Sequence, residues 1–258
     1  FKTNELTAVE ILGAINARIG QQYLVMSDHL GDVVRAHGTK RPVHVTPIYG
    51  VDSTVFKPSS VEKTKLKEEL GLPTSGTLIF FSSRVAPEKD SETLLKAIKI
   101  LLDKGRDVWL LNRSGGYKSI LEEAEKFGLS ERVIATDAAH PHRDLPKSYQ
   151  ASDICIQASR EEGLGFSPLE ALACGVPAIA TSVGGLRETI KSGDTGYTYA
   201  VGDADQLAKC IESIIDDPTE AKRLTEAGRQ MVIARYDKVK VFSDLAALVE
   251  KTVAMRKE

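Results

Sequence analysis

Short apolar runs that alternate with helical sequence constrain the fold of this 258-residue chain more than any other feature. Several runs are continuous and rich in Val and Ile, as expected of strands that are buried on both faces. Their alternation with helices predicts an α/β fold in which a parallel sheet carries helices on both faces. The predicted strands are VHVTPI (43–48), TLIFFSS (77–83), DVWLLN (107–112), RVIAT (132–136), DICIQ (153–157) and PAIAT (177–181).

Helical periodicity fills the segments between these strands and dominates the end of the chain. The predicted helices are at about 5–20, 27–37, 91–104, 117–128, 144–151, 167–174, 203–216, 218–234 and 238–256. Breaker residues between 47 and 58 mark a linker. We therefore expect a small N-terminal piece over 1–48 and a main domain over 49–236. A C-terminal helix over 237–258 is expected to pack back toward the N-terminal portion.

Composition excludes several kinds of partner. The net charge of −2 gives no sign of a nucleic-acid partner, and no apolar run approaches the roughly 20 residues of a transmembrane segment. Cys155, Cys174 and Cys210 lack metal-type spacing, so we interpret them as reduced, buried thiols of a cytoplasmic protein. Because the chain begins with Phe1 and with helical sequence, we expect a fragment or a processed chain.

The segment EEGLGFSPLEALACGVP (161–177) is the most informative about function. It places Glu162 in a glycine-rich turn and Glu170 in the first turn of the following helix. Gly163 and Gly165 let backbone N–H groups approach a ligand, and a helix N-terminus with unpaired N–H groups binds anions. A sugar nucleotide presents a partner for each: its phosphates can bind the N–H groups, and its hydroxyls can donate to the carboxylates.

The same helix start has a structural alternative. Ser167 can cap the helix with Pro168 at its first position, and Ser167-x-x-Glu170 is then a capping box. This segment alone supports capping and ligand binding equally for Glu170, and the two roles can coexist. The spacing does not support a hydrolase pair, because eight helical residues span about 12 Å and hydrolase carboxylates stand roughly 5–9.5 Å apart.

The loop after the strand at 77–83 carries two cations. In an open parallel sheet, ligands bind at the carboxyl ends of the strands, so this loop lies at the same end of the sheet as Glu162. Arg84 and Lys89 can hold a diphosphate there and stabilise it as a leaving group. The alternative for this loop is a solvated surface. The loop has no glycine, so neither an NAD or FAD site nor a P-loop is expected.

Two further loops contain candidate ligand contacts. Gly184 and Gly185 open a helix after the strand at 177–181, either for close approach to a ligand or as a tight turn. Arg113 lies in the glycine-bearing loop LNRSGGYK (111–118) and has weaker support.

The irregular loop over 136–146 is long enough for its backbone to read a nucleotide base. His140 and His142 lie in it, but no third ligand has metal-type spacing, so no metal site is predicted.

Three of these motifs together resemble retaining glycosyltransferases of family 4, and specifically the C-terminal, donor-binding domain of their GT-B fold. SSRVAPEK, EEGLGFSPLEALACGVP and VGGLRE are similar to the donor-site signatures of that family. The resemblance runs from about residue 27 to the end. It implies a Rossmann-like sheet as the C-terminal half of a GT-B fold, with 1–48 as a remnant of the acceptor domain.

The resemblance implies roles for individual residues. Arg84 and Lys89 would hold the donor diphosphate, Glu162 would contact hydroxyls of the transferred sugar, and Glu170 would bind the ribose. Backbone donors around sugar and phosphate would come from Gly163, Leu164, Gly165 and Phe166. The family retains the anomeric configuration and generally uses no catalytic metal, so no cofactor is expected besides the nucleotide sugar substrate.

The chain also departs from the family. Asp90 stands where glycine is frequent, and Asn112-Arg113-Ser114-Gly115 replaces a G-x-G motif. Most of the N-terminal domain, which supplies the acceptor contacts, has no counterpart here, so it is expected to be missing from this chain.

We therefore expect the donor domain of a hexosyltransferase that binds a nucleotide diphosphate sugar for transfer to an unidentified acceptor hydroxyl. UDP-hexose is the default donor by family frequency, and this piece alone should transfer sugar poorly or not at all. The alternatives are a non-catalytic sugar-nucleotide-binding module and a GT-B sugar-nucleotide epimerase. A phosphorylase would need a pyridoxal-binding lysine, for which the sequence has no motif.

Overall fold

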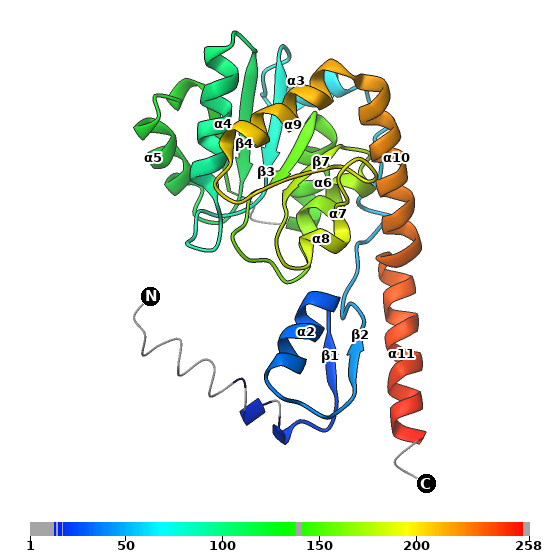
Figure 1. The fold of residues 1–258 in the computed structure, drawn as a ribbon. Helices are drawn as coiled ribbons and strands as arrows, with labels where there is room; N and C mark the ends of the chain where they lie inside the picture. Colours follow the sequence, from blue (N-terminus) through cyan, green and yellow to red (C-terminus); the bar gives the residue numbers. More distant parts are fainter. Residues whose placement is uncertain (1–12, 14, 17, 138–140, 255–258) are drawn as a thin grey trace. The chain divides into compact units, whose positions relative to one another are not determined.

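The computed structural model describes residues 13, 15–16, 18–137 and 141–254, which form parts of two compact units. One unit contains the chain up to Gly50 together with the segment from Lys238 onwards, and the other runs from Val51 to Asp237 (Figure 1). The helix expected over 5–20 falls mostly outside the described residues. His140 is outside them, and so is the side chain of His142.

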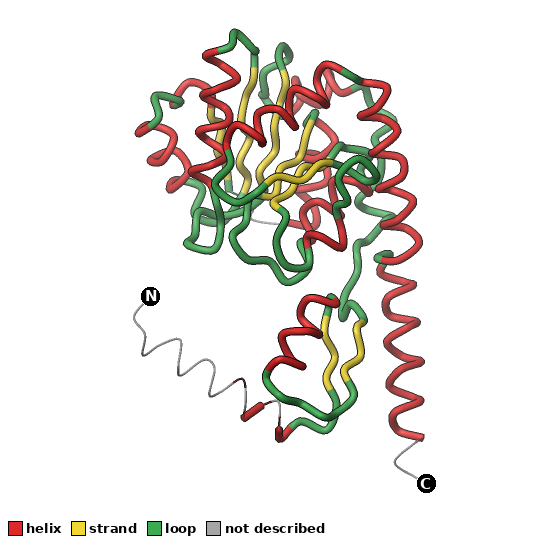
Figure 2. The backbone as a smooth tube through the Cα atoms, viewed as in Figure 1, coloured by secondary structure: helices red, strands yellow, loops and turns green. Residues whose placement is uncertain are grey.

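The larger unit is built on a parallel sheet. Its described residues form six strands in the order β5-β4-β3-β6-β7-β8, and every neighbouring pair is parallel (Figures 1 and 2). The chain builds outward from β3 to β5 and then returns to the other side of β3, so the order reverses between β3 and β6. The strands are β3 (Thr77–Phe81), β4 (Val108–Arg113), β5 (Val133–Thr136), β6 (Ile154–Gln157), β7 (Ala178–Thr181) and β8 (Tyr197–Tyr199).

Helices cover both faces of this sheet. On one face α4 packs against β4 and α9, and α5 packs against β5. On the other face α7 packs against β6 and β7, with α6, α3 and α10 around it. These helices are α3 (Lys63–Glu69), α4 (Ser91–Asp103), α5 (Lys118–Lys126), α6 (Pro141–Ala151), α7 (Phe166–Ala173), α8 (Leu186–Thr189), α9 (Ala204–Asp216) and α10 (Pro218–Arg235).

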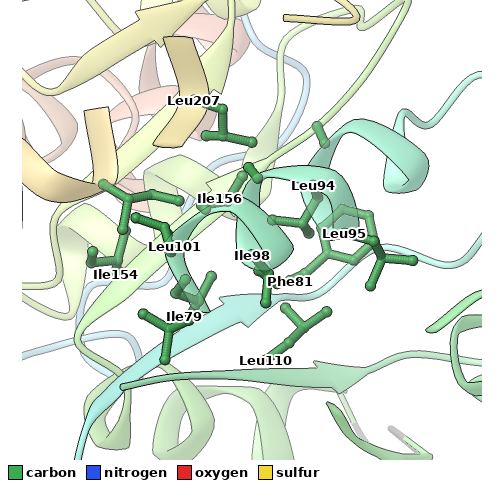
Figure 3. Close-up of a cluster of buried hydrophobic side chains, with 14 of the residues drawn as sticks. Ile79, Phe81, Leu94, Leu95, Ile98, Leu101, Leu110, Ile154, Ile156 and Leu207 are labelled. Carbon is green, nitrogen blue, oxygen red and sulfur yellow. The ribbon is translucent and has the colours of Figure 1, made fainter. Parts of the chain in front are cut away.

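The double cover explains why the central strands read as continuous apolar runs. Successive side chains of a strand point to opposite faces, and in β3 both sets are buried. Ile79 and Phe81 join the core under α4, together with Ile98 (Figure 3). Phe80 meets the edge of the Tyr149 ring of α6, with ring centroids 4.8 Å apart.

The smaller unit contains a short βαβ arrangement. β1 (Tyr23–Val25) and β2 (Val43–Val45) pair in parallel, and α2 (Asp28–Ala36) connects them. Ser27 caps α2 by accepting a hydrogen bond from the Leu30 N–H at 3.2 Å. The unit also includes α11 (Lys238–Ala254), in which the Thr252 hydroxyl donates to Gln22 at 3.3 Å.

The predicted fold class is confirmed: a parallel sheet has helices on both faces, and helices follow its last strand. Four short elements are absent from the prediction, namely β1, β8, α3 and a 3-10 helix, η1 (Ser130–Arg132). The start of α6 was also placed too late, at 144 instead of Pro141. Within the described residues, no helix is both long and apolar enough to span a bilayer.

Candidate functional site

The loops after β3 and β6 come together at the point where the strand order reverses. Open α/β sheets bind their ligands at this point, outside the carboxyl ends of the strands. The two loops pair through their backbones, with an antiparallel bridge between Lys89 and Ser159. The Arg160 N–H also donates to the Glu88 carbonyl at 2.8 Å. The sheet topology therefore places the two loops that carry the predicted cations and the first predicted glutamate side by side.

Lys89 and Glu162 form an ion pair across these loops. Lys89 Nζ lies 2.6 Å from Glu162 Oε2, and the two side chains are 16% and 21% exposed. The same carboxylate oxygen accepts hydrogen bonds from Gln157 Nε2 at 3.1 Å and from the Ser159 hydroxyl at 3.3 Å. Because the pair is largely shielded from water, the attraction between its two charges is strong.

Arg84 lies at the start of the same loop but points into solvent. Its side chain is 70% exposed and meets Glu88 at 3.5 Å. An exposed arginine with such a loose ion pair is held weakly. Of the two predicted cations, the structure therefore brings Lys89 into contact with Glu162 and leaves Arg84 at the rim.

The predicted glycines join neighbouring loops. The Gly185 N–H donates to the Glu162 carbonyl at 3.0 Å, and a Cβ at Gly185 would stand 2.1 Å from the Gly163 carbonyl oxygen. Gly165 has φ +87°, where a Cβ would meet Leu186 at 2.3 Å. At Gly185 only a residue without a side chain lets the two loop backbones approach so closely, and at Gly165 the left-handed backbone favours glycine. The close approach at Gly185 is therefore to another loop of the protein.

The other predicted members of this turn lie at the start of α7. Leu164 is 1% exposed, so its side chain packs inside, and Phe166 is the first residue of the helix. Gly184 has φ +46° in the turn before α8. The backbone groups of Leu164, Phe166 and Gly184 therefore lie beside the loop of Glu162.

Glu170 contacts a different group of side chains. Its Oε2 accepts a hydrogen bond from the Tyr149 hydroxyl at 2.8 Å. The Tyr149 hydroxyl is itself buried against Ser82 and Ser167, at 3.3 and 3.1 Å. Burial raises the pKa of Glu170 from 4.5 to about 7, and the hydrogen bond from Tyr149 opposes this rise. A carboxyl with this pKa changes charge near neutral pH.

The predicted capping box is wrong. Gly165 is the N-cap of α7 and makes no side-chain cap bond, so Ser167 lies inside the helix. Its hydroxyl instead meets Ser82 at 2.7 Å, and Glu170 lies beyond the first turn. The sequence pattern fits a capping box, but the buried Tyr149 and Ser82 compete for both polar side chains. Tertiary contacts therefore decide what Ser167 and Glu170 bind.

Arg113 is used to hold the sheet to α6. Its Nε donates to the Thr136 hydroxyl at 3.0 Å and its Nη1 donates to the Asp144 carbonyl at 3.3 Å. These contacts tie β4, β5 and α6 together and occupy the guanidinium.

Three polar residues at the site were not predicted. Gln157 and Ser159 support Glu162, and Tyr149 supports Glu170. Gln157 carries a recognisable signal, because it is a polar residue at the carboxyl end of an otherwise apolar strand. Tyr149 has no such signal, since it lies within a predicted helix, near the end of α6.

The described residues offer no group of three or more His, Cys, Asp or Glu side chains that could hold a metal ion. The cysteines are free, with Cys155 and Cys174 buried and Cys210 partly exposed. Burial raises the pKa of the Cys155 thiol to about 12, so this thiol is a poor nucleophile. The chemistry that the arrangement offers is recognition of an anion by Lys89 and of hydroxyl groups by two carboxylates.

Residues 62–231 match the family described as "Glycosyl transferases group 1". A putative glycosyltransferase, EpsD of Bacillus subtilis, is 28% identical over 83% of this chain and 57% of its own length. The 2-deoxystreptamine glucosyltransferase of Streptomyces kanamyceticus is 31% identical over 76% of this chain and 51% of its own length. The chain thus spans about half the length of the curated relatives that it matches.

Solved structures show the same fold. Sucrose-phosphate synthase from Thermosynechococcus elongatus superposes with a TM-score of 0.85 at 25% identity, covering 96% of this chain and 62% of that one. HepE of Anabaena in complex with UDP-glucose also has a TM-score of 0.85, covering 95% of this chain and 68% of that one. At 21% identity, the likeness to HepE bears on the fold alone. With the family description covering most of its length, this chain belongs to the glycosyl transferases group 1 family.

Proposed function

We propose that this chain is the donor-binding part of a retaining glycosyltransferase of family 4 with a GT-B fold. It binds a nucleotide diphosphate sugar, with a UDP-hexose as the favoured donor, and presents the sugar to an acceptor hydroxyl. The observation that carries the proposal is the 2.6 Å contact between Lys89 and Glu162, at the point where the strand order reverses. A cation and a carboxylate side by side suit a ligand that carries phosphate next to hydroxyl groups.

In this proposal the ligand separates the ion pair and binds both Lys89 and Glu162. Lys89, helped by Arg84 at the rim, binds the diphosphate and stabilises the charge that grows on it as it leaves. Glu162 is released to accept hydrogen bonds from the sugar hydroxyls, and it stays oriented by Gln157 and Ser159. Glu170 accepts from the ribose hydroxyls. Backbone N–H groups over 163–166 and at Gly184 complete the pocket, and Gly185 holds the loop of Glu162 through its own N–H.

The two units of the chain have different proposed roles. Residues 49–236 bind the donor, and 1–48 belong to a second, acceptor-binding domain whose remainder lies elsewhere in the complete protein. Support comes from the smaller unit, where Leu24 and Val45 of the two-stranded sheet and Ile48 after β2 are exposed at 44%, 38% and 44%. A sheet of two strands is marginally stable in water, and those side chains suit further packing. We place the enzyme in the cytoplasm and propose that it needs neither a metal nor a cofactor.

A nucleotide panel tests the donor assignment. UDP, GDP, ADP and dTDP, each with and without its hexose, are titrated into the chain by calorimetry in buffer with and without EDTA. We expect binding to one nucleoside diphosphate that does not change with EDTA, and no transfer of sugar by this chain alone. Binding of none of the four contradicts the proposal.

The complete protein then separates an enzyme from a binding module. Glu162→Gln keeps the shape of the side chain and removes its charge. We expect this variant to lose turnover while it still binds the nucleoside diphosphate. Turnover that survives the substitution argues for a different catalytic group, and conversion of the donor without any acceptor argues for an epimerase.

A further inference from the structure

Asp90 is a buried carboxylate beside the proposed diphosphate site, and its side chain does not cap its own helix. It occupies the N-cap of α4, where an aspartate usually accepts a hydrogen bond from the first turn. Here that bond does not form, although Asp90 is only 1% exposed. The carboxylate is instead turned toward groups from two other segments.

Each oxygen of the carboxylate meets a different segment. Asp90 Oδ1 accepts from the Arg160 guanidinium at 2.7 Å, and Oδ2 accepts from the Gly202 N–H at 2.9 Å. Asp90 directly follows Lys89, Arg160 stands two residues before Glu162, and Gly202 lies after β8. One side chain therefore joins the loop of Lys89, the loop of Glu162 and a turn at the edge of the sheet.

The charges around Asp90 suit positioning better than stabilisation. A buried ion pair gains little over apolar packing, because both charges lose their hydration, whereas removing one partner leaves the other uncompensated. Arg160 is the cation that faces Asp90, and its side chain is 50% exposed. From β8, the buried Tyr199 also faces it: burial and then the Asp90 charge raise the pKa of Tyr199. These contacts fix the position of the Asp90 carboxylate, although burying its charge costs free energy of desolvation.

We propose that Asp90 is a positioning residue for diphosphate binding, which holds the Lys89 backbone in the place from which its ammonium group reaches the site. The backbone supports this reading, because the Asp90 N–H donates to the Ala158 carbonyl at 3.1 Å. This backbone bond and the bond from the Arg160 side chain hold Asp90, and with it the backbone of the adjacent Lys89, against the loop of Glu162. The inference rests on the proposed function, since it assumes that Lys89 binds a phosphate.

Asp90→Asn tests the proposal, because it keeps the size of the side chain and an acceptor for Gly202 but removes the charge that Arg160 meets. The affinity of the 258-residue chain for UDP is measured by calorimetry, and that for uridine by ligand-detected NMR. If the nucleotide panel selects another base, that nucleoside pair replaces UDP and uridine. We expect affinity for the diphosphate to fall about tenfold, as for a lost charged hydrogen bond, while affinity for the nucleoside stays unchanged.

Two further variants sharpen the test. Arg160→Gln changes a half-exposed side chain and should reproduce the loss, and the double variant should lose no more than either single one. Arg106→Gln, which breaks an exposed ion pair with Asp216 at 2.7 Å, is the matched control and should change neither affinity. Equal losses for UDP and uridine, no loss at all, or additive losses in the double variant would overturn the proposal.

Hydrogen exchange separates this inference from the proposed function. In Asp90→Asn and in Arg160→Gln, we expect faster amide exchange over both 84–90 and 158–162 than in the wild type. Unchanged exchange in these segments overturns the positioning role, even if affinities fall. A wild-type chain that binds no nucleoside diphosphate overturns the proposed function instead, and it removes the role of Asp90 with it.

Discussion

Glu170 gives the larger unit a pH-dependent stability that a single substitution should remove. Burial raises the pKa of Glu170 from 4.5 to about 7. Below pH 4.5 the folded and unfolded chains both carry the proton, so the group has no effect. Between pH 4.5 and 7 the folded chain keeps a proton that the unfolded chain has lost, and stability falls as the pH rises. Well above pH 7 both chains have lost the proton, and stability no longer falls with pH through this group.

The size of the effect follows from these two values. At about 1.36 kcal/mol for each pH unit between them, the full loss is about 3 kcal/mol, of which about 2.5 kcal/mol falls between pH 5 and pH 8. Glu170→Gln cannot ionise and still offers Tyr149 an acceptor oxygen. We therefore expect the substitution to stabilise the chain much more at pH 8 than at pH 5.

Urea unfolding at the two pH values measures the difference. Trp109 is the only tryptophan of the chain and lies in β4, so its fluorescence reports on the larger unit. Glu226→Gln, at an exposed position on α10, controls for the change in net charge. The reasoning is refuted if the gap in unfolding free energy between Glu170→Gln and wild type is the same at pH 5 and pH 8.

Five other substitutions probe the packing and the site. Gly185→Ala should cost about 2 to 3 kcal/mol in urea unfolding, because its Cβ overlaps the neighbouring loop, whereas Gly115→Ala, whose Cβ meets open space, should stay within about 0.5 kcal/mol. Ile98→Ala removes a fully buried side chain and should cost about 3 kcal/mol in the same assay. Lys89→Gln should weaken nucleoside diphosphate binding roughly tenfold in calorimetry. Arg113→Gln should leave that affinity unchanged, since its guanidinium is bound to β5 and α6, and a large loss would show that it reaches the ligand.

The elements that sequence predicts well are those whose pattern is strong by itself. TLIFF over 77–81 is apolar on both faces because helices cover both, and its strand begins at Thr77 as predicted but ends two residues before the predicted end. α9 and α10 begin where the sequence places them, since Asp203 and Asp217 accept cap bonds from the N–H groups of Gln206 and Glu220. Local signals suffice for such elements because no other part of the chain competes for the same groups.

The elements that sequence misses are those that depend on a neighbour. β8 has three residues and pairs only along β7 among the described strands. α3 is mostly charged, and Leu66 and Lys67 are its buried residues. Lys67 is buried because it reaches Asp153 at 2.8 Å, a partner 86 positions away in the sequence. No window of local sequence contains that contact, so neither periodicity nor composition can predict it.

The candidate site also has a part that sequence predicts and a part that it does not. That Lys89 and Glu162 lie together follows from a rule of topology, because the carboxyl ends of adjacent parallel strands share one edge of the sheet. What the rule cannot give is the direction of each side chain. Arg84 obeys the rule and yet points into solvent, and Arg113 turns toward α6.

The two charges of the candidate site neutralise each other, and this sets a condition on any ligand. Lys89 and Glu162 satisfy each other at 2.6 Å, so a bare phosphate gains the lysine only by leaving a half-buried carboxylate without its cation. A ligand that brings phosphate for Lys89 and hydroxyl donors for Glu162 in the same molecule re-pairs both charges at once. If the proposed function holds, we therefore expect the ion pair to favour a diphosphate joined to a sugar over either part alone, before any contact with the base.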